Sequence, residues 1–125
     1  MKHTTTQNIK FLRLKRRLKL PHWGVVGILQ SIWTFAMNNA KDGGIGRYSN
    51  DDLAAAVEWD GNPDEFVRAL LECGWLNFHD EARLVIHDWH EHAPSFVRGN
   101  LAKAGKSFLG NGKPWKKTQN QPVIS

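Results

Sequence analysis

Residues 62–89 read NPDEFVRALLECGWLNFHDEARLVIHDW, and this stretch decides the fold. Asn62 is a suitable helix N-cap, Pro63 fits the first helical position, and Glu65 stands where a capping box places a carboxylate. Apolar residues at helical spacing follow, and Gly74 is typical of a helix end. Beyond Gly74, apolar and polar residues alternate as in two short strands, with Leu76 and Phe78 in the first and Leu84 and Ile86 in the second. The stretch therefore predicts a helix that leads into a two-stranded hairpin.

Two segments upstream complete the pattern. The stripe of Val25, Leu29, Ile32 and Ala36 predicts a long core helix, whose apolar surface is widened by Trp23, Ile28 and Phe35. Ser49 and Asp52 form a capping pair that opens a further helix over residues 49–59, and we expect residues 45–48 to add a short strand to the hairpin. Two helices joined by a turn and followed by a hairpin predict a mainly α protein with a small β-hairpin, a winged helix-turn-helix. Trp89 is expected in the core, and Pro94 is expected to begin a last helix.

Charge is unevenly distributed along the 125 residues. The first 19 residues carry +7, residues 103–117 carry +5, and neither flank contains an acid; the centre holds all 12 acids against five cations and nets −7. We divide the chain into a basic N-terminal arm (1–20), a winged-helix domain (21–104) and a basic flexible C-terminal tail (105–125). Basic arms neutralise phosphates and release counterions, so the flanks favour nucleic acid as a partner. The alternative is that the arms are merely solvated.

Several classes are disfavoured by composition. The single cysteine, Cys73, cannot form an internal disulfide, which fits a reducing compartment. The N-terminus lacks the apolar run of a signal peptide, and no segment is apolar enough to span a membrane. Residues 10–20 form a basic amphipathic segment, but it is short for a membrane-surface helix. We therefore expect a soluble, cytoplasmic protein with no membrane partner.

Three longer motifs carry a resemblance to a known family. They are WGVVGILQSIWTFA (23–36), DGGIGRYSNDDLAAAVEWDGNPDEFVRALLECGWLNF (42–78) and LVIHDWHEHAPSFVRGNLAK (84–103), with Trp33, Trp59, Gly74, Trp75 and HDWHEHA as landmarks. The run from Leu12 to Lys103 resembles the N-terminal winged-helix domain of phage replisome-organiser and DnaD-like replication proteins. The resemblance implies a role in phage or prophage DNA replication, and a homo-oligomer or a replication protein as a further partner.

The expected recognition helix is poor in cations. Residues 63–72 contain three acids, Asp64, Glu65 and Glu72, and the single cation Arg68. Arg68 can approach a base edge, but pairing with Asp64 or Glu72 four residues away is the favoured alternative. The DNA contacts are therefore expected mainly on the flanks, with Arg68 and Arg83 as additions. The candidate DNA-binding residues are Lys10, Arg13, Lys15, Arg16, Arg17, Lys19, Arg68, Arg83, Lys103, Lys106, Lys113, Lys116 and Lys117.

Aromatic residues among the C-terminal lysines, Phe108 and Trp115, are suited to stacking on single-stranded bases, so both duplex and single-stranded DNA are candidate partners. The cluster of His87, Asp88, His90, Glu91 and His92 matches no metal motif, and we expect no metal and no cofactor. No nucleophile or paired-carboxylate motif indicates an enzyme. The alternatives left open are a transcriptional regulator of the same fold and a protein-binding adaptor without DNA contact.

Overall fold

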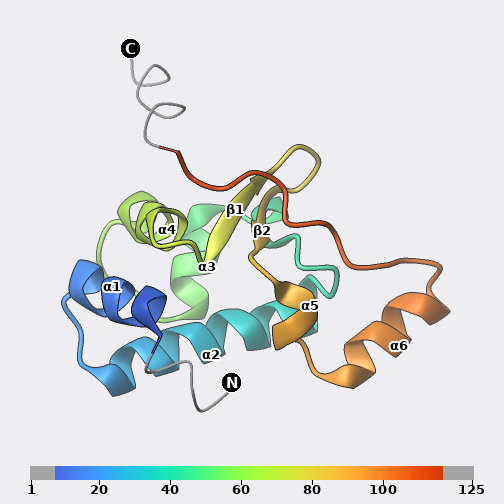
Figure 1. Cartoon of the computed structure of the whole chain (residues 1–125), viewed down its shortest axis with the longest axis horizontal. Coiled ribbons are helices and arrows are strands. Elements are labelled where there is room, and N and C mark those ends of the chain that lie inside the picture. Colours follow the sequence, from blue (N-terminus) through green and yellow to red (C-terminus); the bar gives the residue numbers. More distant parts are fainter. Residues whose placement is uncertain (1–7, 117–125) are drawn as a thin grey trace.

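Helix α2, His22–Asn39, is the longest element, and the others are arranged around it (Figure 1). The computed structural model describes residues 8–116 of the chain. Over this range the protein is mainly helical, with one two-stranded antiparallel sheet. The predicted class is confirmed, and the order of helices and hairpin is compatible with a winged helix. The buried face of α2 contains the predicted stripe, Val25, Leu29, Ile32 and Ala36.

Helix α1, Ile9–Leu18, packs against α2 and α4. Its N-cap is Asn8, whose Oδ1 accepts a hydrogen bond from the backbone N–H of Lys10 at 2.7 Å. It ends at Lys19, which adopts the left-handed conformation with φ of 58°. The buried face joins the common core through Phe11, Leu14 and Leu18. Residues 9–18 of the predicted arm are thus a helix of the folded body, while the boundary placed at residue 20 stays a prediction.

Helices α3, Asn50–Ala56, and α4, Pro63–Glu72, begin at the predicted caps. The Ser49 hydroxyl accepts from the N–H of Asp52 at 3.1 Å, and the Asn62 side chain accepts from the N–H of Glu65 at 3.1 Å. After α4 the chain reverses at Gly74, which has φ of +82° as predicted. Local hydrogen bonding therefore determines where both helices begin and where α4 ends.

The hairpin consists of β1, Leu76–His79, and β2, Arg83–Ile86. The strands pair antiparallel, with Leu76 opposite Ile86 and His79 opposite Arg83. Both alternating pairs found in the sequence lie in these strands, so the predicted hairpin is confirmed.

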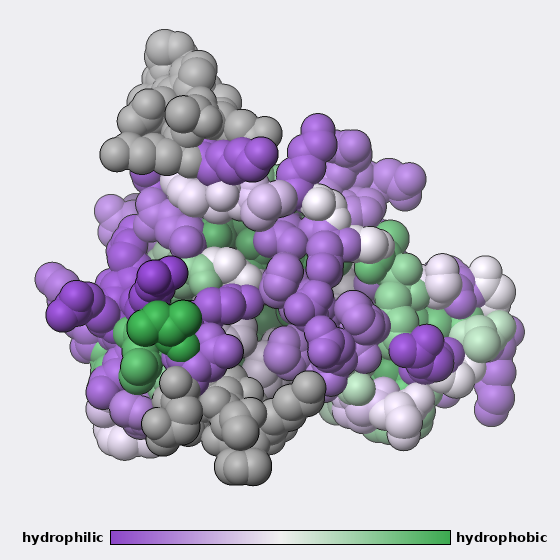
Figure 2. All heavy atoms as spheres, viewed as in Figure 1, coloured by the Kyte–Doolittle hydropathy of each residue, from purple (hydrophilic) through white to green (hydrophobic). Residues whose placement is uncertain are grey.

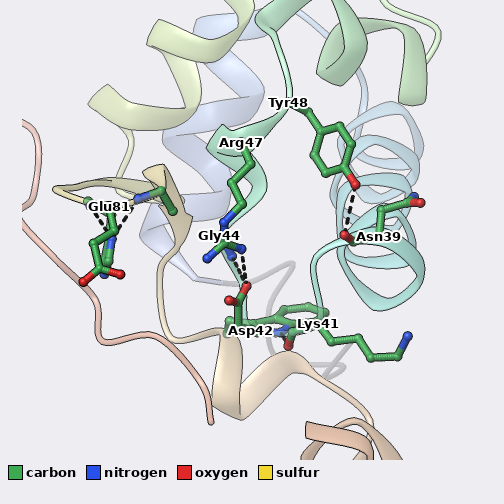
Figure 3. A network of polar contacts seen from close by, with 10 residues as sticks. Asn39, Lys41, Asp42, Gly44, Arg47, Tyr48 and Glu81 are labelled. Atoms are coloured by element: carbon green, nitrogen blue, oxygen red, sulfur yellow. Dashed lines mark hydrogen bonds and ion pairs between the residues drawn. The ribbon is translucent and has the colours of Figure 1, made fainter. Parts of the chain in front are cut away.

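The prediction of a strand at residues 45–48 is wrong. Residues Ile45–Arg47 form a short 3-10 helix, η2, beside β2. Gly43 turns the backbone with φ of +95°, and Asp42 accepts hydrogen bonds from Gly44 N–H at 3.0 Å and from Arg47 at 2.9 Å, which closes the turn (Figure 3). A glycine in the left-handed region and a side-chain cap favour a turn over extended backbone.

The chain continues beyond the hairpin in α5, Trp89–His92, and α6, Ser95–Lys103. Trp89 is buried as predicted, and its indole N–H donates to the carbonyl of Lys41 at 2.7 Å. Residues 105–116, which we call the C-terminal strap, then run back from α6 across the hairpin (Figure 1). Within residues 8–116, no helix combines the length and hydropathy needed to cross a bilayer.

Candidate nucleic-acid interface

The outer face of α1 is a basic surface on a rigid support. The inner face of the helix is held in the core by Phe11 and Leu14, so the outward side chains have a fixed frame. The helix contains no acid, and its last turn holds three of its cations. We call Arg13, Lys15, Arg16, Arg17 and Lys19 the α1 basic face; four of them are exposed and Lys15 is half-buried.

Apolar side chains interrupt the basic face. Ile9 and Leu12 are 59% and 39% exposed, and with Leu20 they line a shallow open groove along α1. Figure 2 shows a compact apolar patch over α1 that is surrounded by hydrophilic residues. The surface of α1 therefore combines positively charged side chains with exposed apolar side chains.

Lys10 differs from the other cations of α1 because it faces the body of the protein. Its Nζ lies 4.7 Å from the centroid of the Trp75 ring, a cation–π distance, and the Trp75 indole N–H donates to the Lys10 carbonyl at 3.3 Å. Burial lowers the pKa of Lys10, and the nearby charge of Asp88 partly opposes this effect. Lys10 is thus committed to internal packing and is a weak candidate for phosphate contact.

Glu72 joins the α1 basic face to α4. Its two carboxylate oxygens accept from Arg17 Nε at 3.0 Å and from Arg68 Nε at 3.2 Å. The Arg68 guanidinium also lies 5.3 Å from the centre of the Trp115 ring. The expected pairing of Arg68 with Glu72 is confirmed, so this arginine is not presented freely as a base-reading residue.

The second half of the C-terminal strap is attached to the hairpin. Phe78 and Lys113 exchange two backbone hydrogen bonds of 2.8 Å, and the Trp115 ring stacks on Phe78 at 6.4 Å between centroids. Nearer α6, the N–H of Leu109 donates to the carbonyl of Asp42 at 3.0 Å. The strap brings Lys113 and Lys116 back to the body of the protein, and Trp115 to the side of Arg68.

A polar network fixes the middle of the strap. The buried Asn77 amide donates to the Asn111 carbonyl at 2.8 Å and contacts His87 Nδ1 at 3.0 Å, while the Asn111 side chain donates to Asp88 at 2.8 Å. Because the carbonyl of Asn111 can only accept, the Asn77 nitrogen faces both groups and His87 Nδ1 must be the acceptor. Burial, aided by the charge of Lys10, lowers the pKa of His87. The hydrogen bond from Asn111 lowers the pKa of Asp88 against the opposing effect of burial.

The guanidinium group of Arg83 bonds to backbone carbonyls of the protein itself. Its Nε donates to the carbonyl of Gly46 at 3.0 Å, and its second guanidinium nitrogen donates to the carbonyl of Tyr48 at 2.8 Å. At the hairpin tip, His79 Nδ1 accepts from the N–H groups of Glu81 and Ala82, each at 3.2 Å. The side chains of His79 and Arg83 at the hairpin tip are therefore already hydrogen-bonded within the fold, His79 to the turn itself and Arg83 to the η2 segment.

The candidate cations do not form one surface. Glu72 brings Arg17 and Arg68 together, and the strap places Trp115 next to Arg68. Lys103 lies at the end of α6 and Lys106 just beyond it, on the opposite side of the molecule from α1 (Figure 1). Lys117 is outside the described residues.

Acids are concentrated on other elements of the fold, although Glu72 of α4 pairs with Arg17 of α1. The first turns of α3 and α4 contain Asp51, Asp52, Asp64 and Glu65, and the hairpin tip contains Asp80 and Glu81. Since these elements include the expected recognition helix, the charge segregation of the sequence persists in three dimensions. Phosphate contact is favoured at α1 and disfavoured at the start of α4.

Sequence reasoning misplaced Trp23. We expected its ring to widen the apolar surface of the core helix, but the side chain is 79% exposed. It lies in the first turn of α2, immediately after the bend at Pro21, where the buried stripe of the helix has not yet begun. The proximity of Pro21 was the only sequence signal for this exposure.

The His-rich segment places possible ligand atoms close together. Those of Asp88, His90 and Glu91 lie within 4.8 Å of one another. Asp88 is already bonded to Asn111 and contacts His87 at 3.3 Å. The absence of a metal stays a prediction.

Comparison with protein families, with curated proteins and with solved structures finds no match for this chain.

Proposed function

We propose that the protein binds DNA through the α1 basic face, as a non-enzymatic component of phage or prophage DNA replication initiation. The observation that carries the DNA-binding part is the position of five cations along one helix and its C-cap, on an element that is anchored in the core and has no acid. Four of them, Arg13, Lys15, Arg16 and Lys19, lie outside the Arg17–Glu72 ion pair. A fixed array of this kind neutralises adjacent phosphates without the cost of ordering a loose arm. The replication part is supported only by the resemblance of residues 12–103.

Attachment is mainly to the backbone. The α4 helix begins with two acids, and its single cation is paired with Glu72, so strong base reading by α4 is disfavoured. Binding should therefore be steep in salt and weakly dependent on sequence.

The test compares the full chain with an R13Q/R16Q/K19Q variant by fluorescence anisotropy on labelled DNA across a salt series. The expected result is a shallower dependence of log affinity on log salt, with the slope reduced by about 0.9 for each phosphate that the variant no longer neutralises. An R98Q/K103Q/K106Q variant is the matched control, because it also removes three cations, in α6 and just beyond it, at the far end of the molecule.

An equal reduction in the control would assign the binding to general positive charge and contradict the role of α1. Absence of binding by the wild-type chain at low salt would remove the DNA proposal and leave the protein-binding adaptor. A single high-affinity operator would instead favour the transcriptional regulator.

A further inference from the structure

Trp23 is the most exposed of the large apolar side chains among residues 8–116. Trp33, Trp75 and Trp89 are buried, and Trp115 is covered by Phe78 and Arg68. The two aromatics that the sequence offered for stacking are therefore engaged within the fold, since the Arg98 guanidinium also lies 5.1 Å from the centre of the Phe108 ring. An indole left in water forgoes a large amount of apolar burial, which is typical of a recognition surface.

The exposed indole is held on a rigid bend between α1 and α2. Pro21 accepts backbone hydrogen bonds from Gly24 at 3.0 Å and Val25 at 3.2 Å, which fixes the first turn of α2. The neighbouring His22 ring lies 5.3 Å from Phe11 in the core. The backbone that carries Trp23 is thus fixed by hydrogen bonds and by the packing of its neighbour His22.

Cations precede this bend directly. Lys15, Arg16 and Arg17 form the last turn of α1, and Lys19 ends the helix four residues before Trp23. Backbone bonds from Lys19 to Arg16 and from Leu20 to Lys15, both of 3.3 Å, keep that turn closed against the bend. The cations at the end of α1 and the exposed Trp23 therefore lie on either side of one short bend in the chain.

We propose that the α1–α2 bend is a binding site for single-stranded DNA, in which a base stacks on Trp23 while the last turn of α1 holds the flanking phosphates. This inference rests on the proposed DNA binding and adds the strand type and the stacking residue. In a duplex the base faces are stacked on each other, so the indole has no face to contact; in a single strand each base offers one.

A membrane surface fits these features less well. One face of the ten-residue α1 is committed to the core, so the aliphatic side chains left to enter a membrane are Ile9, Leu12 and the half-buried Leu20. That area is small for interfacial binding. Binding to anionic lipid is therefore the competing outcome that the experiment must distinguish from DNA binding.

The experiment measures anisotropy of a labelled oligothymidylate of about 12 nucleotides and of a duplex of similar length, using the full chain. Replacement W23A should weaken binding of the single strand by roughly 5- to 150-fold, the range for one stacked base, and leave duplex affinity unchanged. W23F should retain most of the single-strand affinity. F96A is the matched control, because Phe96 is an exposed aromatic, 54% accessible, on α6.

Because Trp23 is exposed, W23A should melt like the wild type in circular dichroism, which separates stacking from unfolding. Single-strand affinity that is unchanged in W23A, or reduced equally for duplex and single strand, would overturn this inference and leave DNA binding intact. No binding of either DNA by the wild type would overturn both. Binding of the wild-type protein to phosphatidylglycerol vesicles but not to the oligonucleotide would also overturn the inference.

Discussion

Replacing Phe11 by alanine tests whether α1 is a structural part of the protein. The Phe11 side chain is 0% exposed, and its ring lies 5.3 Å from His22. Truncation of a fully buried phenylalanine removes its transfer free energy and leaves a cavity, which costs about 3–5 kcal/mol. Since small domains are stable by only ~5–15 kcal/mol, F11A should lose a large fraction of the free energy of unfolding.

The matched control is L12A, the next residue along the same helix, which is 39% exposed and should cost below ~1 kcal/mol. Urea unfolding followed by circular dichroism gives both values, and the melting temperature of F11A should fall by roughly 10–20 °C. Equal, small effects of F11A and L12A would mean that residues 9–18 are an independent arm. That result would contradict the proposal that the α1 basic face is a rigid surface for DNA binding.

Three further predictions concern charge, backbone and pH. E72Q removes the carboxylate that pairs with Arg17 and Arg68. DNA affinity measured by anisotropy should rise up to roughly eightfold at 0.1 M salt, as expected for one added phosphate contact. An unchanged affinity would mean that DNA binds elsewhere on the protein. Gly112 has φ of +65°, and a Cβ at this position would overlap the Phe78 carbonyl oxygen. G112A should therefore detach the strap from the hairpin and speed proteolysis of the strap. G110A is the control and should have no such effect, because a Cβ at Gly110 would lie in open space. The pKa of His87 is lowered in the folded state, so the unfolded chain binds the proton first and the free energy of unfolding should fall as pH drops below 6.5. H87Q should flatten that slope in thermal melts, and an unchanged slope would contradict the lowered pKa of the half-buried His87 imidazole.

Several parts of the fold were predictable because they depend on residues close together in the chain. Asn62 and Ser49 cap helices by bonding to N–H groups three residues away, and Gly74 ends α4 through its own backbone conformation. The alternation in β1 and β2 follows from the pleat of a strand, which puts every second residue on one face.

Other parts depended on residues far apart. The strand expected at residues 45–48 is instead η2, which packs against β2, and that packing is not visible in residues 45–48 alone. Arg83 was a candidate DNA contact, yet it bonds to carbonyls about 35 positions earlier in the chain. No local pattern reports such partners.

The sequence by itself determined where α3 and α4 begin, the hairpin and the separation of basic flanks from an acidic centre, because capping, alternation and charge are properties of neighbouring residues. The end expected for α3 at residue 59 was wrong, since this helix ends at Ala56. Only the tertiary structure decided which cations and aromatics are available. It paired Arg17 and Arg68 through Glu72, covered Trp115 and left Trp23 open. The physical reason is that burial and ion pairing depend on which surfaces meet when α1, α4 and the strap pack together, and those surfaces come from segments far apart in the chain.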